Sequence, residues 1–411
     1  MKKPYYKDIL QMNLLRSSLS RSPLPAIWIL VLMTSVGPFG DTEYTPSLPR
    51  IADELGVSYA AVQQSMTVYL IAFAMMQLVY GPLSDRVGRK PIALGGALLF
   101  TVGSYICWIS TSLDFLLIGR FLQGLGSCAG AIISSAAVRD SFDKDKIDLI
   151  YTKINTAFAV APAAGPIVGA LVDDHYGWHA NMLILLISGL LLLFSVLFFF
   201  PETHNPDKNQ HLQPKYIWKN YTTLFHEKNF LPAILINGIA IGVVYTSLTE
   251  GPALIIKTLG LSSRWIAVVA MGIFLAFVIG SFINMFLQKR LTSKSIVKIG
   301  LFFILAGGVC LAAVGYIDYL HLDTVLGSIM LSFIGVALIV PGSVAIAMRP
   351  FEKIAGAASA MIGFSQMIIA ALANVGVSLL HFEPVYSLAI IFATLAFIGL
   401  FAHYLGFKTD R

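Results

Sequence analysis

Charged side chains are scarce in this sequence. They make up 12% of its 411 residues, whereas 57% of the residues are hydrophobic. Soluble domains carry about 25% charged residues, because a surface in contact with water needs them. The composition therefore excludes an ordinary water-soluble fold and indicates that the lipid bilayer is the solvent of this chain.

Signatures of several protein classes are also missing. The chain has three cysteines, without the CxxC spacing of redox or metal sites: Cys107, Cys128 and Cys310. His175 and His179 have the spacing of helical metal ligands, but Gly177 between them breaks the helix, so we expect no metal. No phosphate-binding loop of the form G-x-x-x-x-G-K-S/T occurs, which argues against an ATP-driven pump. Without a clustered nucleophile, we expect neither an enzyme nor a cofactor.

Twelve apolar runs of helical length fill most of the chain. Unpaired backbone amides are so costly in lipid that segments of about twenty residues must span it as helices. Strands of about ten alternating residues are not seen. The sequence thus predicts an all-α integral membrane protein with twelve transmembrane helices, at about 26–47, 61–82, 91–111, 114–137, 150–173, 181–200, 230–250, 264–287, 296–316, 324–347, 355–380 and 384–406.

The basic residues indicate the orientation. If the amino terminus is cytoplasmic, all but four of the 28 basic residues lie in cytoplasmic loops or terminal segments. The exceptions are Arg50, Lys257 and Arg264 on the outer side and Arg120 inside a span. Because cytoplasmic loops carry an excess of Lys and Arg, both termini are predicted to be cytoplasmic. The net charge of +6 follows from this bias and does not indicate a nucleic-acid partner.

The longest polar interruption, residues 201–229, divides the helices six and six and contains three prolines. Two bundles of six suit a transporter that rocks one bundle against the other around a site at the membrane midplane. A channel has no special need for this division. The predicted segments are a cytoplasmic N-terminal segment 1–25, a first bundle 26–200, a cytoplasmic linker 201–229, a second bundle 230–406 and a cytoplasmic tail 407–411.

A dense charged turn separates the second and third spans, with the sequence Gly81-Pro82-Leu83-Ser84-Asp85-Arg86-Val87-Gly88-Arg89-Lys90. Gly81 and Gly88 are predicted to permit a tight reversal of the chain. Asp85 can pair with a nearby guanidinium or face a helix N-terminus, and the basic residues hold the turn at anionic head groups. The alternative is that the turn is only a basic loop and has no part in any conformational switch.

Arg120 is the charge that most needs a partner. An arginine at a helix centre costs about 3 kcal/mol unless a partner or water offsets the cost. Antiparallel spans place Asp41 at nearly the same depth, and Glu43 follows it closely. Burial disfavours a charged carboxylate while a guanidinium favours it, and these opposing effects allow proton exchange near neutral pH. Snorkelling is the alternative, because Arg120 lies about 9 Å from the outer edge.

The fifth span carries small residues at four-residue spacing. They are Ala161, Gly165 and Gly169, with Pro166 among them. Such spacing lets another helix approach closely, and a proline inside a helix favours a kink. Plain helix packing without any bearing on transport is the alternative interpretation.

Three of these patterns resemble signatures of the major facilitator superfamily. The turn 81–90 matches every fixed position of its G-x-L-x-D-R-x-G-R-K/R motif, and residues 120–126 are similar to its R-x-x-Q-G-x-G motif. Gly165-Pro166 and Gly169 resemble its antiporter motif, with Ala161 in place of the leading glycine. The resemblance implies that the turn latches the two bundles at the cytoplasmic face and that the protein is an exporter.

Further segments resemble the bacterial branch of bicyclomycin, chloramphenicol and MdfA-type proton antiporters. They are residues 41–49, 138–140, 177–178 and 356–360. That branch usually has D-M-Y-L-P-x-L-P in its first helix, which puts the acid at Thr42, whereas this chain has acids at 41 and 43. Successive helical residues turn by about 100°, so Asp41 and Glu43 cannot both face Arg120 squarely. Either can carry the proton.

The predicted function is proton-coupled export of amphiphilic small molecules, such as drugs, across the bacterial inner membrane by alternating access. The proton gradient supplies the energy, and a monomer in the bilayer suffices. An exporter of one endogenous metabolite, such as a siderophore or a sugar, is the alternative. A membrane-embedded enzyme or receptor would need a catalytic cluster or a soluble domain, which are not seen. Candidate cavity residues are Tyr44, Gln123, Asn237, Tyr245 and Glu250, although Glu250 also suits an interfacial position.

Overall fold

The computed structural model describes residues 24–204, 221–351, 354–380 and 382–407, and all secondary structure assigned within them is helical. The first half contains α2 (Ile27–Thr42), α3 (Leu48–Leu55), α4 (Tyr59–Val87), α5 (Arg89–Trp108), α6 (Leu113–Ser141), α7 (Lys144–Tyr176) and α8 (Trp178–Phe199). The second half contains α10 (Phe230–Ala253), α11 (Arg264–Leu287), α12 (Ser293–Tyr316), α13 (Leu322–Met348), α14 (Ala355–Leu380) and α15 (Pro384–Gly406). Most of the predicted segments 1–25 and 407–411, and much of the predicted linker, lie outside the described residues.

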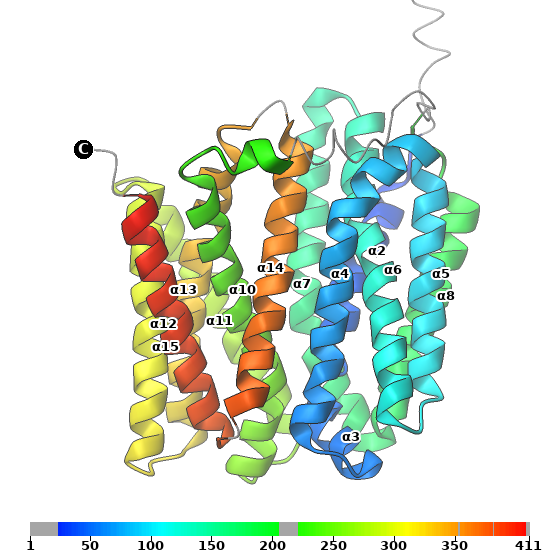
Figure 1. Cartoon of the computed structure of the whole chain (residues 1–411). Coiled ribbons are helices and arrows are strands. Elements are labelled where there is room, and N and C mark those ends of the chain that lie inside the picture. Colours follow the sequence, from blue (N-terminus) through cyan, green and yellow to red (C-terminus); the bar gives the residue numbers. More distant parts are fainter. Residues whose placement is uncertain (1–23, 205–220, 352–353, 381, 408–411) are drawn as a thin grey trace, which may run out of the picture.

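The helices form two groups that stand side by side (Figure 1). Within the first half, α4 and α5 pack on α6, α8 packs on α5, and α2 packs on α7. Within the second half, α12 packs on α13 and α15, and α10 packs on α13, α14 and α15. The halves meet where α4 packs on α14 and α7 packs on α11. These four long helices build most of the interface between the halves, and α10 adds smaller contacts with α3 and with the turn before it.

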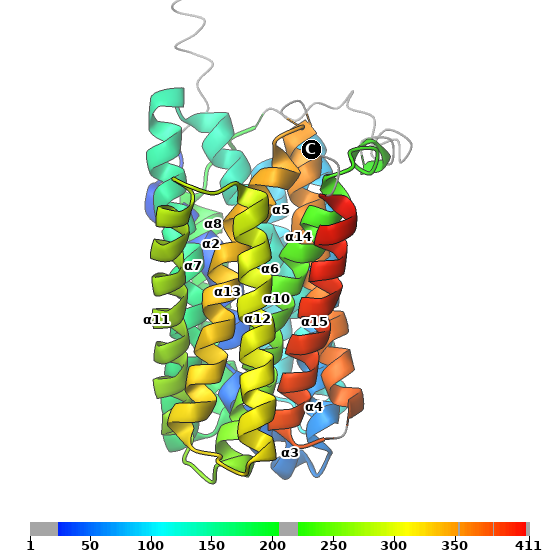
Figure 2. The ribbon, with the colours of Figure 1, turned by 90° about the vertical axis from the view of Figure 1, so that its left-hand side faces the viewer.

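The two ends of the bundle are named here by what lies there. The short helix α3 lies at one end, at the bottom of Figure 1, and this end is called the α3 end. The helices α2 and α15 begin and finish, respectively, at the opposite end, which is called the terminal end (Figures 1 and 2).

Eleven helices of the described chain are long and apolar enough to cross a membrane. They coincide with the predicted runs from 61–82 onward, and α11, α14 and α15 have the predicted bounds. The first run differs, because α2 ends at Thr42 after 16 residues, or about 24 Å, short of a hydrocarbon core of about 30 Å. A 3-10 turn at Thr45–Ser47, containing Pro46, continues the path into α3. The prediction of one regular helix over 26–47 therefore needs this correction.

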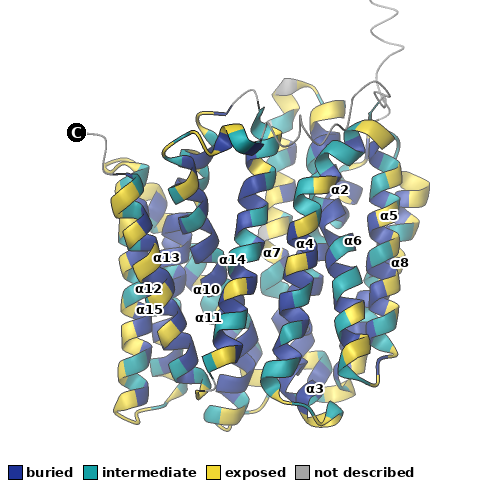
Figure 3. Cartoon of the chain, viewed as in Figure 1, coloured by how far each residue is buried: buried dark blue, intermediate teal, exposed yellow. Residues whose placement is uncertain are grey.

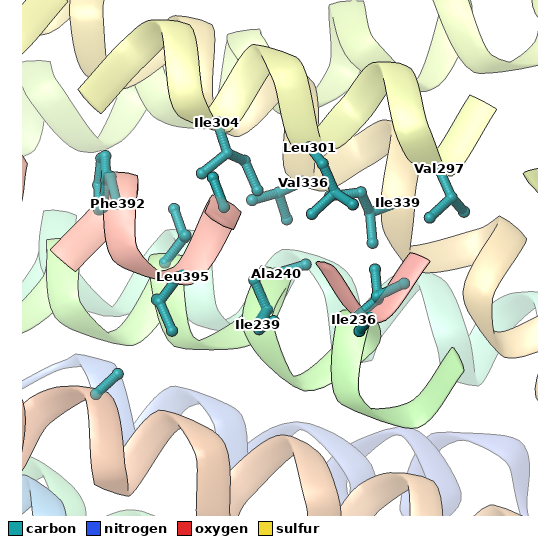
Figure 4. Close-up of a cluster of buried hydrophobic side chains, with 14 of the residues drawn as sticks. Ile236, Ile239, Ala240, Val297, Leu301, Ile304, Val336, Ile339, Phe392 and Leu395 are labelled. Atoms are coloured by element: carbon teal, nitrogen blue, oxygen red, sulfur yellow. The ribbon is translucent and has the colours of Figure 1, made fainter. Parts of the chain in front are cut away.

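Side chains sort by environment as expected for a bundle in lipid. Exposed residues lie along the outer surfaces of the helices (Figure 3). Many of the exposed residues are large and apolar, among them Phe194, Phe282 and Phe397. A soluble protein would not expose so many large apolar groups. Inside the second half, α10, α12, α13 and α15 share a core of aliphatic side chains around Ile239 and Leu301 (Figure 4). Close packing of core side chains makes each half a rigid unit.

Candidate transport site

A cavity of about 400 Å³ lies between the two halves. Its walls come from α2, α4 and α7 of the first half and from α10, α11, α13 and α14 of the second. Most lining side chains are apolar, and the aromatic ones are Phe73, Phe158, Phe274, Phe277, Phe333 and Tyr245. Among the lining residues, Asp41 alone carries a charge when ionised. The cavity therefore has the size and chemistry of a site for an amphiphilic small molecule.

Asp41 joins the two halves. Its carboxylate is 4% exposed, and Oδ2 accepts a hydrogen bond of 2.6 Å from the hydroxyl of Tyr245 on α10. The second oxygen, Oδ1, is buried and has no hydrogen-bond partner among the residues that the structure describes. A buried carboxylate with one unfilled oxygen is a costly arrangement when charged. Asp41 is thus placed to bind a proton or a polar group of a molecule in the cavity.

Arg120 on α6 is completely buried, so it does not snorkel to the membrane surface. Its Nη1 donates hydrogen bonds to the Gly40 carbonyl at 3.1 Å and to Gln123 Oε1 at 2.7 Å. The rings of Tyr44 and Tyr69 lie against the guanidinium, with centroids 4.0 and 4.3 Å from its central carbon. Cation–π contacts in such desolvated surroundings stabilise a charge by about 2 kcal/mol.

The expected direct pairing of Arg120 with an acid is not found. Among the described residues, Arg120 Nε and Nη2, Asp41 Oδ1 and both Glu43 oxygens lack hydrogen-bond partners. The depth argument placed Arg120 correctly, because it contacts Gly40, the neighbour of Asp41. The direction was wrong, because Asp41 turns toward Tyr245 instead. The Arg120 charge still acts on both acids over a short distance.

Glu43 occupies a different environment from Asp41. It is fully buried and does not line the cavity. Within the described part of the chain, neither oxygen of its carboxyl group has a hydrogen-bond partner. The two acids therefore lie in different environments: Asp41 faces the cavity, and Glu43 faces the interior of the first half.

The small residues of α7 pack against this acid-bearing segment. A Cβ atom at Gly165 would collide with the Thr42 hydroxyl, and one at Gly169 would collide with the Glu43 carbonyl oxygen. Pro166, between them, lines the cavity. The absence of side chains at Gly165 and Gly169 is therefore what allows α7 to touch the backbone that carries Asp41 and Glu43.

Replacing Gly169 by alanine should strongly destabilise the protein. The added methyl group forces α7 away from the Glu43 carbonyl, and overpacking of this kind costs about 2 kcal/mol. The matched control is Gly95→Ala in α5, where no heavy atom lies within 4 Å of the added carbon. The control should be neutral or stabilised by about 1 kcal/mol. Thermal unfolding in detergent measures both, and equal midpoints for the two variants would contradict this packing argument.

Of the five predicted cavity residues, Tyr245 alone lines the cavity. Tyr44 and Gln123 contact Arg120 inside the first half. Asn237 lies behind the wall, where its Oδ1 accepts a bond of 2.7 Å from Gln366, a lining residue. Glu250 is turned toward α4, where Gln63 donates to it at 2.5 Å. These four positions are corrected because polarity within a span does not tell which face of the helix meets the cavity.

The lining phenylalanines were not identified from the sequence. Phe73, Phe158 and Phe333 come from α4, α7 and α13, and Phe274 and Phe277 come from α11. Phenylalanine also covers the lipid-facing surface, so its occurrence in a span does not distinguish the two environments. Gln366 did carry a signal, as a polar residue within an apolar run.

Polar contacts join the two halves at the α3 end. Gln63 donates to Glu250, Gln64 donates to Ser378 at 3.0 Å, and the Tyr59 hydroxyl donates to the Thr249 carbonyl. An ion pair of 2.8 Å joins Arg264 on α11 to Asp174 on α7. At the terminal end, Tyr221 donates to the Leu78 carbonyl at 3.2 Å. In the described chain, the halves are thus joined more extensively at the α3 end.

The predicted turn 81–90 is mostly helical. Helix α4 continues to Val87 and α5 begins at Arg89, so the reversal occurs at Gly88 alone, with φ of 108°. Gly81 lies inside α4, which corrects its predicted role in the turn. A single residue with positive φ, which glycine adopts without strain, is enough to separate the helices.

Arg89 organises the polar contacts of this turn. It is 5% exposed and donates to Asp85 Oδ1 at 2.6 Å and to Asp140 Oδ2 at 2.8 Å. Arg86 is exposed and Lys90 is half-buried. In the described chain, the hydrogen bonds of the turn reach α4, α6 and the segment after α8, all in the first half. A latch onto the second half remains a prediction.

Glu202, which the sequence reasoning missed, holds the start of α5. Its carboxylate accepts from the backbone N–H groups of Arg89 at 2.8 Å and Lys90 at 3.0 Å. A carboxylate at a helix N-terminus fills unpaired donors and complements the helix dipole. A Cβ at Gly88 would also collide with this carboxylate, which gives the glycine a second reason to be there. The turn is therefore tied to the chain that leaves α8.

Comparison with known proteins agrees with this architecture. The profile of the Major Facilitator Superfamily matches residues 27–374. Multidrug resistance protein D of Escherichia coli is 28% identical over 83% of this chain and 85% of its own length. A bicyclomycin resistance protein homolog of Haemophilus influenzae is 26% identical over 94% of this chain and 96% of its own. Multidrug resistance protein MdtL of a Shewanella species is 29% identical over 90% and 92%.

Solved structures share the fold at low sequence identity. A mutant of a POT peptide transporter superposes with a TM-score of 0.77 at 14% identity, covering 94% of this chain and 96% of its own. A D-xylose–proton symporter superposes with a TM-score of 0.71 at 13% identity, covering 91% and 96%. The chain therefore belongs to the Major Facilitator Superfamily, as a multi-pass membrane transporter and not an enzyme, in the branch that contains the multidrug-resistance proteins.

Proposed function

We propose that this protein exports amphiphilic small molecules, drugs among them, in exchange for protons. The observation that carries the proposal is the position of Asp41. It is the one carboxylic acid among the lining residues of the cavity, and it is bonded to Tyr245 in the opposite half. A single titratable group that both contacts the substrate site and joins the moving bodies can couple proton binding to their movement.

The lining of the cavity supports an amphiphilic substrate. Phenylalanine side chains from both halves offer apolar surface to a flat or lipophilic group, and Asp41 and Gln366 offer polar contacts. A siderophore or a sugar would leave most of its hydroxyl groups without partners against these walls. The metabolite exporter is therefore the weaker alternative.

The exchange runs in two steps. When a substrate enters, Asp41 carries a proton; the substrate takes its place at the carboxyl group, the O–H bond breaks, and the proton passes to water, because one carboxylate cannot serve both partners fully. When a proton binds, the carboxylate loses its charge, the substrate is released, and the bond with Tyr245 weakens so that the halves can move apart at the α3 end. Each proton that crosses supplies about 2.3 kcal/mol per 100 mV of membrane potential.

The charge distribution supports the proposed orientation in the membrane, and three further assignments complete the proposal. The terminal end is cytoplasmic, and the α3 end faces outward across the bacterial inner membrane. The helix α2 and the 3-10 turn after it act together as the twelfth span. The protein works as a monomer in the bilayer without a cofactor or a nucleic-acid partner, and the turn 81–90 acts as the conformational latch.

Purified protein in proteoliposomes tests this function. The probe compounds are tetraphenylphosphonium, a cationic amphiphile, and chloramphenicol, a neutral one. With an imposed pH gradient, the internal pH should rise when either compound enters the liposomes and fall when it leaves them. In detergent without buffer, addition of either compound should release protons that a pH indicator detects. Binding of these compounds without any proton release would contradict antiport.

A further inference from the structure

A second group of polar side chains lies buried in the first half, away from the cavity. It is called the buried polar cluster and consists of Glu43, Ser47, Asp173 and Asn181. All four are at most 1% exposed. Asn181 on α8 donates to Ser47 Oγ at 2.8 Å and to the Gly169 carbonyl at 3.0 Å. Gly169 in turn touches the Glu43 carbonyl, so the cluster connects the segment after α2 with α7 and α8.

Several oxygens of this cluster have no donor. They are Glu43 Oε1 and Oε2, Asp173 Oδ1 and Asn181 Oδ1. The orientation of the Asn181 amide is well defined, because the Gly169 carbonyl can only accept a hydrogen bond. Every unpaired atom is therefore an acceptor. Buried acceptors in such number suit a site where protons and water molecules supply the donors.

One end of the cluster reaches the surface at the α3 end. Asp173 Oδ2 lies 3.4 Å from Arg50 Nε, and the Arg50 side chain is 39% exposed. The other end is Glu43, two residues from Asp41, which faces the cavity. Charged groups that act on the cluster from its neighbours are Arg50, Glu54, Arg120 and Asp174. The cluster thus extends from the surface to the acids of α2 without passing through the cavity.

We propose that the buried polar cluster is a proton path from the α3 end to Glu43, separate from the route of the substrate. This proposal rests on the proposed function as a proton antiporter. A proton from water binds the Asp173 carboxylate and passes through the Ser47 hydroxyl, or through water held by Asn181, to the Glu43 carboxylate. Each transfer breaks one O–H bond and forms another, so the net change is one proton moved to Glu43.

This path has a consequence for coupling. At the α3 end, the contacts of Gln63 with Glu250 and of Tyr59 with Thr249 hold the two halves together. A proton that used the cavity would have to wait until these contacts break. A path within the first half lets Glu43 exchange protons with the outside while the substrate route is closed.

The test follows Glu43 directly and needs no substrate. After a rapid change of pH, time-resolved infrared difference spectra of the full-length protein report the carboxyl band of protonated Glu43, which Glu43→Gln identifies by its loss. Asn181→Leu keeps the branched shape of the side chain, at a larger volume, but removes the amide, and it should slow proton exchange at Glu43 by about tenfold or more. Asp173→Asn and Ser47→Ala are milder variants that should slow it in the same direction.

The matched control is Asn284→Leu in α11. Asn284 is also a buried amide, 3% exposed, and donates to the Ala337 carbonyl at 3.0 Å, but it lies in the second half. This control should leave the exchange rate at Glu43 unchanged. Equal rates for Asn181→Leu and wild type would overturn the path, and so would a Glu43 band that does not respond to pH.

Two other outcomes separate this proposal from neighbouring ones. One is that sodium chloride stabilises the wild-type protein more than choline chloride does and that Asp173→Asn abolishes the difference. That result would show a bound monovalent cation in place of a proton path. If tetraphenylphosphonium releases protons from wild type and Asn181→Leu exchanges normally at Glu43, the path fails while antiport stands. If wild type releases no protons with either probe compound, antiport fails, and the path fails with it.

Discussion

Asp41→Asn should abolish proton-driven export while leaving the protein folded. Asparagine has the same shape, and its Oδ1 can still accept the hydrogen bond that Tyr245 donates, but it cannot exchange a proton. For a neutral substrate exchanged for one proton, loss of the coupled charge removes about 2.3 kcal/mol per 100 mV, or about 50-fold in the gradient reached. Uptake of chloramphenicol into inverted vesicles, with and without a gradient, measures this loss.

The matched control for Asp41→Asn is Ser247→Ala. Ser247 also lines the cavity, but its hydroxyl donates to the Val243 carbonyl of its own helix at 2.7 Å. The control should keep proton release and change affinity only slightly. If Asp41→Asn still builds the wild-type gradient and releases protons on substrate addition, Asp41 is not the coupling group.

Arg120→Lys should lose most transport even though it keeps the charge. The guanidinium lies between the rings of Tyr44 and Tyr69 and uses one nitrogen to bond both Gly40 and Gln123. An ammonium group cannot stack in this planar way and is more strongly hydrated. We expect transport below about a tenth of wild type and a loss of about 2 kcal/mol in the free energy of unfolding. Transport in vesicles and unfolding in detergent check the two parts.

Variants of Tyr69 separate stacking from hydrogen bonding at Arg120. Tyr69→Phe keeps the ring but removes the hydroxyl that donates to Ser127 at 2.8 Å, whereas Tyr69→Leu removes the ring. Only the second should resemble Arg120→Lys. Wild-type transport by Arg120→Lys would show that charge alone suffices and that the aromatic contacts do not matter for function.

The sequence predicted the helices well because their positions depend on the length and hydropathy of continuous segments of the chain. Length and hydropathy located α11, α14 and α15 with their observed bounds. The exceptions arise where proline and glycine act in context. Pro46 accompanies a 3-10 turn that shortens α2, whereas Gly81 continues α4 despite its flexibility. Neighbouring segments, not the local residues alone, decided these two cases.

The sequence predicted the depth of the site residues in the membrane but not the directions in which their side chains point. Arg120 and the segment around Asp41 do meet, as antiparallel spans of known depth require. Which groups bond there depends on the rotation of each helix about its axis, and a shift of one residue turns a side chain by about 100°. For this reason the sequence could not choose between Asp41 and Glu43, and it placed Asn237 and Glu250 at the cavity when they lie behind or beside it.

Composition and spacing were sufficient to show a helical membrane protein, because the cost of burying charge and bare backbone in lipid leaves few other solutions. The tertiary structure alone assigned Asp41 to the cavity and Glu43 to the interior of the first half. Tyr245, the partner of Asp41, is 204 residues away in the chain. Gly169 on α7 decides how closely the acids are packed. Such contacts arise only when helices from distant parts of the chain are packed together, since each one depends on the rotation of two helices at once.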